Sequence, residues 1–158
     1  MKQIPGMMLK DDFIIRLAAA EEATVLHEAD SQIFSDPWSE KSYLGSIESN
    51  METVPVIVIK ETGEIAAYAA VSYVLDEANI NRIAVMPDYR GNGLGTVLLE
   101  WIENNLPEDV TVYNLEVRES NKYAIEMYEK FGYTVLGRRK RFYRNPEEDA
   151  LLMTKRKV

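Results

Sequence analysis

The sequence contains no cysteine and only one histidine, His27. Without cysteine, the chain has no disulfide framework, no thiol nucleophile and no cysteine ligand for a metal, as is common for proteins of a reducing cytoplasm. His27 falls in a predicted surface helix, where we expect a solvated side chain rather than a base or a metal ligand. No metal site is therefore expected, since zinc sites of the usual kind need several such ligands.

Long hydrophobic stretches are also missing from the 158 residues. No apolar run approaches the roughly 20 residues that span a bilayer, so we expect no contact with a membrane. The first six residues, Met-Lys-Gln-Ile-Pro-Gly, lack the hydrophobic block of a signal peptide. These absences together predict a cytoplasmic protein.

Basic residues are in the minority, 18 against 26 acidic ones, which gives a formal net charge of −8. A general nucleic-acid-binding protein needs a basic face, so direct binding of nucleic acid is not expected. An acidic body instead suits a basic protein or peptide substrate, through electrostatic steering. One basic run stands out, Arg138-Arg139-Lys140-Arg141 with Arg144. Two interpretations of it remain open: a solvated strand and turn, or an aid in holding an anionic cofactor or positioning a substrate.

The chain has the length of one domain with a substantial core, and it shows no repeat or linker. Strand-like and helix-like patterns alternate along it. We expect strands at 13–17, 54–59, 65–75, 79–86, 110–118, 133–143 and 150–154, and helices at 19–34, 39–47, 121–131 and from a glycine-rich turn to about 105. Ser39 can cap the second helix. This order predicts an α/β protein with a mixed sheet covered by helices, in a single domain over 12–158 after a short tail, 1–11.

The most informative segment is the glycine-rich turn between a predicted strand and a predicted helix. It consists of Arg90, Gly91, Asn92, Gly93, Leu94, Gly95 and Thr96. Three glycines within five residues allow positive φ and leave no side chains in the way of a ligand. The first amides of the following helix lack an intrahelical acceptor and lie at the positive end of its dipole. The turn is therefore predicted to bind a pyrophosphate through backbone amides.

Two common phosphate-binding motifs do not fit this turn. A P-loop needs Lys and then Ser or Thr directly after its last glycine, whereas Gly95 is followed by Thr96 and Val97. The dinucleotide fingerprint has another glycine spacing and lies early in its fold. The spacing Arg90-x-x-Gly93-x-Gly95 instead resembles the acetyl-CoA-binding motif of the GNAT superfamily of N-acetyltransferases.

Further segments resemble one branch of that superfamily, the bacterial ribosomal-protein-alanine N-acetyltransferases. They are Ser-Asp-Pro-Trp-Ser at 35–39, Leu-Asp-Glu-Ala at 75–78, Ile-Ala-Val at 83–85, Leu-Glu-Val-Arg at 115–118 followed by Ser120-Asn121, Ala-Ile-x-x-Tyr-Glu at 124–129 and Glu-Asp-Ala at 148–150. The resemblance covers about residues 12–155. It implies the GNAT acyl-CoA N-acyltransferase fold with acetyl-CoA as cosubstrate. It also implies transfer of acetyl to the N-terminal alanine of a basic partner, small-subunit ribosomal protein S18.

Glu116 is the candidate general base for the attacking amine. Along its predicted strand, one face changes from apolar to polar and so leads out of the core into a cleft, through Val110, Val112, Asn114, Glu116 and Arg118. A carboxylate partly withdrawn from water at such a place suits general-base work. From the residues alone, an ion pair with Arg118 or across the strands is an equal alternative. The resemblance assigns Glu116 the role of proton acceptor.

Tyr128 is the candidate general acid for the departing thiolate, because a phenol stays protonated at neutral pH. Asn121, Ile125 and Tyr128 share one face of a predicted helix. From the residues alone, a helix cap at Asn121 and a core aromatic at Tyr128 are the simpler interpretation. The resemblance makes Tyr128 the proton donor and Asn121 a contact of the cofactor.

The resemblance also assigns the strand Ile83-Ala84-Val85 to the cofactor. A backbone amide of this strand would polarise the thioester carbonyl in the manner of an oxyanion hole. A gap between this strand and the strand of Glu116 would admit the pantetheine arm. Trp38, Asp76 and Tyr143 match positions that shape the peptide end of the cleft, although each also has a plain core or turn interpretation.

Three functions from different classes remain open. The first is an N-terminal acetyltransferase acting on a ribosomal protein, the second a GNAT enzyme that acetylates lysine side chains or a small amine, and the third a non-catalytic acyl-CoA-binding domain. The presence of both Glu116 and Tyr128 disfavours the third. Segments 34–47 and 141–148, which we expect to wall the acceptor site, decide between the first two.

Overall fold

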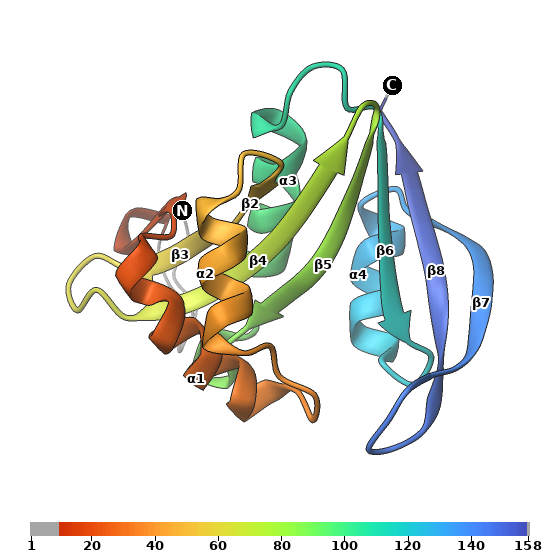
Figure 1. Ribbon diagram of the computed structural model, residues 1–158, viewed down its shortest axis with the longest axis horizontal. Coiled ribbons are helices and arrows are strands. Elements are labelled where there is room, and N and C mark those ends of the chain that lie inside the picture. Colours follow the sequence, from red (N-terminus) through yellow and green to blue (C-terminus); the bar gives the residue numbers. More distant parts are fainter. Residues whose placement is uncertain (1–9, 158) are drawn as a thin grey trace.

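The computed structural model describes residues 10–157, which form one mixed sheet with helices on both faces (Figure 1). The strands are β1 (Phe13–Leu17), β2 (Glu52–Thr53), β3 (Pro55–Ile59), β4 (Ile65–Val74), β5 (Glu77–Val85), β6 (Val112–Arg118), β7 (Thr134–Tyr143) and β8 (Glu148–Arg156). Their order across the sheet is β1-β3-β4-β5-β6-β8-β7, and β2 pairs with β4. The helices are α1 (Ala23–Ile33), α2 (Glu40–Glu48), α3 (Leu94–Asn105) and α4 (Lys122–Lys130), joined by short 3₁₀ helices at Lys10–Asp12, Ala20–Glu22 and Pro87–Tyr89.

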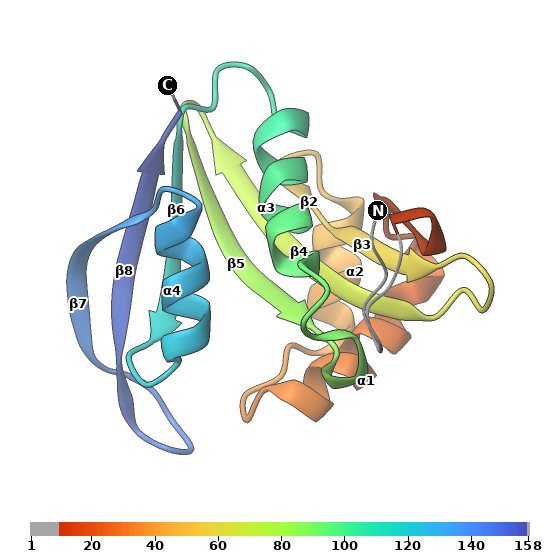
Figure 2. The ribbon, with the colours of Figure 1, turned by 180° about the vertical axis from the view of Figure 1, so that it is seen from behind.

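Each face of the sheet has its own hydrophobic core. Helices α1 and α2 cover one face, where their apolar side chains pack on β3 and β4; this core includes Leu26, Ala29, Tyr43, Val56 and Tyr68. Helices α3 and α4 cover the opposite face, as Figure 2 shows. Their core includes Leu98, Leu99, Tyr128, Leu115 and Met153. We call the two halves of the sheet its wings, β1–β5 on one side and β6–β8 on the other. The helices fix both wings, while the cleft between the wings stays open.

The two wings separate along β5 and β6, which are parallel neighbours for only part of their length. Their pairing runs from Glu77–Val112 to Ile80–Leu115 and ends there. At the same point β4 and β5 shift register, so that Asn81 is an extra residue between the pairs of Ile80 and Arg82. A β-bulge of this kind bends its strand. Beyond it, β5 and β6 diverge in a V (Figure 1) and leave the edge of β5 without a neighbour on that side.

The predicted fold class and the main elements are confirmed. Ser39 caps α2 as expected, since its Oγ accepts a hydrogen bond from the Ser42 amide at 3.0 Å. The two-residue strand β2 was not predicted, because it is too short for any residue pattern to reveal. Strand β8 extends at both ends beyond the predicted 150–154, because its pairing with β6 continues through charged residues that interrupt the apolar pattern.

The predicted tail, 1–11, lies for its greater part outside the described residues, so the predicted domain boundary stays a prediction. Between residues 10 and 157, the structure contains no helix that is long and apolar enough to cross a membrane. The same stretch brings no group of three or more histidine and acidic side chains together in a way that could hold a metal ion.

Candidate active site

A cleft of ≈ 1290 Å³ lies between the two wings of the sheet. Its walls come from the loop after α1, from β5, from β6 and from the turn between β7 and β8. It brings together seven of the residues predicted for the site: Trp38, Ile83, Arg90, Glu116, Asn121, Tyr128 and Tyr143. Residues that are far apart in the sequence therefore meet where β5 and β6 separate.

Glu116 lies on β6 and faces the cleft together with Asn114 and Arg118, as the strand alternation predicted. Its Oε2 atom is buried and has no hydrogen-bond partner among the described residues. Arg139 on β7 forms an ion pair with it, since Arg139 Nε lies 3.6 Å from Oε2, a distance that is too long for a hydrogen bond. Of the two ion pairs left open by the sequence, the one with Arg118 is wrong, because Arg118 pairs with Glu148, whereas an ion pair across the strands is present with Arg139. Glu116 thus retains one carboxylate oxygen that accepts no hydrogen bond from the described residues, on a side chain that is 30% exposed.

Tyr128 on α4 has a buried ring and a hydroxyl group that lines the cleft. The ring packs against Tyr133, with the two centroids 5.9 Å apart. Within the described part of the chain the hydroxyl makes no hydrogen bond, so a core tyrosine with a satisfied hydroxyl is not what the structure shows. Burial raises the pKa of Tyr128 above its ordinary value. The phenol is therefore protonated at neutral pH and able to donate.

Tyr143 reaches the cleft from the end of β7 because that strand is irregular. The β7–β8 register shifts between Arg139 and Tyr143, and Arg141 has a left-handed φ of 54°. The Asp149 carboxylate fixes this conformation by accepting the Arg141 amide at 3.0 Å. Burial, followed by the negative charge of Glu116, raises the pKa of Tyr143 to about 12. A strand irregularity next to the cleft thus places a second protonated phenol in the same cleft as the candidate base.

The glycine-rich turn has the backbone that anion binding needs. Gly91 and Gly93 have φ values of 86° and 75°, and an added Cβ would meet nothing within 4 Å at either position. In the described chain, no acceptor is found for the first amides of α3, those of Leu94, Gly95 and Thr96, and no side chain caps the helix. These amides therefore remain available for a phosphate at the helix N-terminus.

The expectation that all three glycines serve positive φ was wrong for Gly95. Gly95 lies within α3, where an added Cβ would come within 2.6 Å of the Met127 sulfur on α4. Its role is therefore close packing between α3 and α4, although the flexible end of a methionine can move aside.

The edge of β5 also offers backbone groups to the cleft. The Met86 amide donates to the Ala66 carbonyl on the β4 side at 2.8 Å. Because successive residues of an antiparallel strand alternate in direction, the backbone of Ala84 also faces β4, whereas Ile83 and Val85 face the gap. The Val85 carbonyl accepts a hydrogen bond from Arg90 Nε at 3.1 Å, which ties the glycine-rich turn to the strand end.

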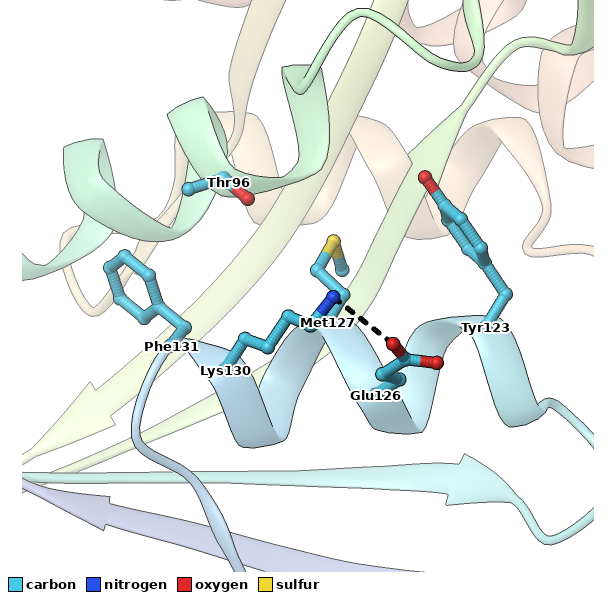
Figure 3. Close-up of a pocket in the computed structure, with 6 residues that line it drawn as sticks. All are labelled: Thr96, Tyr123, Glu126, Met127, Lys130 and Phe131. Carbon is cyan, nitrogen blue, oxygen red and sulfur yellow. Dashed lines mark ion pairs between the residues drawn. The ribbon is translucent and has the colours of Figure 1, made fainter.

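A second, smaller pocket of ≈ 270 Å³ lies between α3 and α4 (Figure 3). Its lining is Thr96 on α3 and, on α4 and just beyond it, Tyr123, Glu126, Met127, Lys130 and Phe131. Figure 3 shows Lys130 turned towards Glu126, and these two side chains form an ion pair of 3.0 Å. Thr96 belongs to the first turn of α3, so the pocket adjoins the amides at the start of that helix.

Two of the candidate residues have other or additional structural roles. Asn121 caps α4, because its Oδ1 accepts the Ala124 amide at 3.2 Å, and it also lines the cleft. Asp76 lies outside the cleft in the β4–β5 turn, where its carbonyl accepts the amides of Thr111 and Val112; this position does not support a role in substrate binding.

The expectation of a solvated His27 was wrong. Its ring is half-buried, and Nδ1 lies 2.7 Å from the Trp38 carbonyl oxygen. A single histidine on a helix gives no sequence signal for a contact eleven residues away, because that contact depends on how the following loop folds back.

Sequence reasoning also missed Asp30, which is fully buried. Its Oδ1 accepts the hydroxyls of Tyr43 and Tyr68 at 2.8 and 2.6 Å. Its Oδ2 accepts the Trp38 amide at 2.8 Å and Arg82 Nε at 3.2 Å. The one available signal was Arg82 itself, a charge in the otherwise apolar end of β5.

Comparisons with known proteins agree with this geometry. The family model described as "Acetyltransferase (GNAT) family" matches residues 23–133. The chain is 38% identical over 120 residues to the ribosomal protein bS18-alanine N-acetyltransferase of Escherichia coli K12, covering 74% of this chain and 79% of that protein. It is 36% identical over 133 residues to the enzyme of the same name from Haemophilus influenzae, covering 81% and 88%.

Among solved structures, the chain is similar to the ribosomal-protein-S18-alanine N-acetyltransferase of Escherichia coli. The TM-score is 0.82 at 31% identity, and the match covers 91% of this chain and 93% of the other.

Proposed function

The chain belongs to the GNAT family of acetyltransferases, and on this premise we propose that it transfers acetyl from acetyl-CoA to the N-terminal α-amine of a protein. The preferred acceptor is the N-terminal alanine of ribosomal protein bS18, the substrate named for its relatives in Escherichia coli and Haemophilus influenzae. The observation that carries the proposal is that, in the described chain, Glu116, with a carboxylate oxygen that accepts no hydrogen bond, and Tyr128, with a hydroxyl that makes none, line the same cleft where β5 and β6 part.

The residues present fit acetyl-CoA. Free amides at the start of α3 and two glycines with positive φ suit its pyrophosphate. The backbone of Ile83 and the Val85 amide, which have no strand neighbour on this side among residues 10–157, suit an extended pantetheine arm, which would hydrogen-bond to β5 as an added strand does. Acetyl-CoA supplies a thioester, which is an activated acyl group with a thiolate as leaving group.

Glu116 is proposed as the proton acceptor. The α-amine must lose a proton before or during its attack on the thioester carbonyl, and Glu116 takes that proton directly or through one water. Because an α-amine has a reference pKa near 8, against about 10.4 for lysine, it needs less help from a carboxylate base near neutral pH. The chemistry of the site therefore favours an N-terminal amine.

Tyr128 is proposed as the proton donor. As the nitrogen–carbon bond forms and the carbon–sulfur bond breaks, the departing sulfur takes up a proton from the phenol. Backbone amides of β5 that face the gap stabilise the negative charge on the carbonyl oxygen during attack, as in an oxyanion hole. Both reactants occupy the cleft at the same time, so transfer is direct and involves no acetylated enzyme.

Mass spectrometry after incubation with acetyl-CoA tests this proposal. The acceptors are a basic peptide that begins with alanine, the same peptide with a blocked N-terminus and one lysine, and a small polyamine. We expect a gain of one acetyl group on the free N-terminus of the first peptide. Acetylation of the blocked lysine peptide or the polyamine in preference to it would contradict the proposal and favour the second function left open by the sequence.

A further inference from the structure

Arg118, the last residue of β6, makes contacts that catalysis as described above does not use. Its Nη1 donates to the Pro146 carbonyl at 2.9 Å and to Glu148 Oε1 at 3.2 Å. Its Nη2 donates to the Arg144 carbonyl at 2.9 Å. Its guanidinium lies 4.5 Å from the centroid of the Tyr143 ring. One side chain on β6 therefore fixes the whole turn between β7 and β8.

The same guanidinium also reaches across the cleft to the other wing. Its Nη2 donates to Ser35 Oγ at 3.3 Å, and Ser35 Oγ in turn donates to the Arg144 carbonyl at 3.3 Å. Ser35 belongs to the loop after α1, which we call the 34–38 loop. Arg118 and Ser35 together thus form a bridge between this loop and the β7–β8 turn. Both hydrogen bonds that Ser35 Oγ makes in this bridge are exposed.

The 34–38 loop is also held from the opposite strand. Arg82 on β5 donates from Nη2 to the Asp36 carbonyl at 2.5 Å, and its guanidinium lies 4.1 Å from the centroid of the Phe34 ring. Arg82 is largely buried and paired with Asp30, so its attachment to the 34–38 loop is more rigid than the exposed attachment through Arg118. The two diverging strands thus each send one arginine to the same loop, and only the Arg118 side spans the cleft.

The position of the bridge has a consequence for the shape of the acceptor. The backbones of β5 and β6 are furthest apart at their C-terminal ends, where Figure 1 shows the V at its widest. A groove open at both ends admits a chain that runs through it, whereas a groove closed at one end admits only the end of a chain. An N-terminal amine is the end of a chain, while the amine of an internal lysine has chain on both sides.

We propose that Arg118 is a positioning residue, which closes the wide end of the cleft through Ser35 and so selects a free N-terminus over an internal lysine. This inference rests on the proposed N-terminal acetylation. It assigns Arg118 no contact with the reacting atoms. Loss of the bridge should therefore change the choice of acceptor and leave the binding of acetyl-CoA unaffected.

The experiment compares four variants for two matched peptides, one with a free N-terminal alanine and one with a blocked N-terminus and an internal lysine. In Arg118→Met, the ratio of their kcat/KM values should fall roughly tenfold or more, as expected for lost hydrogen bonds to a charged group. In Ser35→Ala it should fall about threefold, since one neutral hydroxyl is lost. Arg118→Lys should restore part of the selectivity because it keeps the charge. KM for acetyl-CoA should stay within about twofold of the parent value in all of them.

Arg156→Met is the matched control. Arg156 lies at the other end of the sheet, opposite Val112, and loses the same charge without touching the cleft. An equal loss of selectivity in this variant would show a general charge effect and overturn the inference. If Arg118→Met does not fold, as judged by circular dichroism, Ser35→Ala decides alone, because it removes only an exposed hydroxyl.

Two failures can be told apart. If the parent enzyme acetylates the alanine peptide but Ser35→Ala and Arg118→Met keep its selectivity, only the role of Arg118 is wrong. If the parent does not acetylate the alanine peptide, the proposed function is wrong, and the inference that depends on it is wrong as well.

Discussion

Two clusters in this protein contain the same kinds of side chain but connect them differently. In the wing of α1 and α2, Asp30 is surrounded by two tyrosines and one arginine: Tyr43, Tyr68 and Arg82. In the wing of α4, Glu116 likewise shares its surroundings with two tyrosines and one arginine: Tyr128, Tyr143 and Arg139. Every donor of the first cluster reaches the carboxylate at 2.6–3.2 Å, whereas the second has a buried carboxylate oxygen without a hydrogen bond.

The difference separates a structural cluster from a chemical one. Buried polar groups in proteins are nearly always hydrogen-bonded, and leaving one unpaired costs about 1–3 kcal/mol. The Asp30 cluster follows that rule and joins α1, α2, β4 and β5 into one rigid wing. The Glu116 cluster departs from it in the cleft, where a substrate can supply the missing partners. Substitutions in the first cluster should therefore reduce stability, and those in the second should reduce activity.

The largest effect is expected for Tyr128→Phe. The substitution removes only the hydroxyl that is unpaired in the structure, so folding and cofactor affinity should persist. Because the departing sulfur loses its proton donor, kcat should fall roughly 10²–10⁴-fold. Steady-state kinetics with thermal unfolding measures both. Tyr73→Phe, a partly buried position outside the cleft, is the control. A kcat within about threefold of the parent would mean that the tyrosine is structural.

Glu116→Gln should follow, with roughly a 10²-fold loss of activity near pH 7 in a protein that still folds. Raising the pH should restore part of it for a peptide with a free N-terminus, because an α-amine deprotonates unaided above its reference pKa near 8. A lysine peptide should recover only about two pH units higher. The pH–rate profile checks this, with the exposed Glu100→Gln as control. Full activity of the Glu116 variant at pH 7 would exclude Glu116 as the base.

Asp30→Asn tests the structural cluster and should lower the free energy of unfolding by about 3 kcal/mol or more, because it leaves the buried Arg82 without a counter-charge. Urea unfolding gives this value. At a temperature where the variant is folded, kcat should change far less than in Tyr128→Phe. A variant with the stability of the parent and a loss of kcat as large as that of Tyr128→Phe would contradict the division between the two clusters.

Gly93→Val extends the comparison to the backbone. Valine is strained at a φ of 75°, and the strain would displace the amides at the start of α3, so KM for acetyl-CoA should rise at least about tenfold. Gly63→Val is an unusually close control, since Gly63 has the same φ of 75°, is equally open, and lies in a turn outside the cleft. Calorimetry should show weaker acetyl-CoA binding in the first variant only; unchanged binding in a folded Gly93→Val would exclude the turn.

The smallest effect is expected for Tyr43→Phe, about 1 kcal/mol of stability from one hydrogen bond to Asp30. Burial raises the pKa of Tyr43 above its ordinary value of 10.0. The folded state thus holds this proton more tightly than the unfolded state, so the stability it contributes is complete below pH 10 and is lost as the pH rises further. Thermal unfolding from pH 8 to 11 should therefore show a shallower alkaline loss in the variant than in the parent.

The sequence by itself determined what depends on neighbouring residues. Alternation placed Glu116 on the polar face of β6, and glycine spacing placed positive φ at Gly91 and Gly93 before a helix. Helical spacing put Tyr128 on the face of α4 that joins the core. Each of these features follows from the backbone geometry of a few neighbouring residues, which the spacing of residue types along the sequence can show.

Only the tertiary structure decided which side chains are paired. The partners of Asp30 lie up to 52 residues away, and Arg118 meets Ser35 across 83 residues. The strand pattern offered Arg118 as a partner for Glu116, but Arg118 bonds Glu148, and one Glu116 oxygen accepts no hydrogen bond within the part of the chain that the structure describes. Hydrogen bonds need their atoms within about 3 Å, and no local pattern fixes such a distance between segments that only the folded sheet brings together. The residue types were therefore present in the sequence, but the division between a satisfied cluster and an unsatisfied one arose in three dimensions.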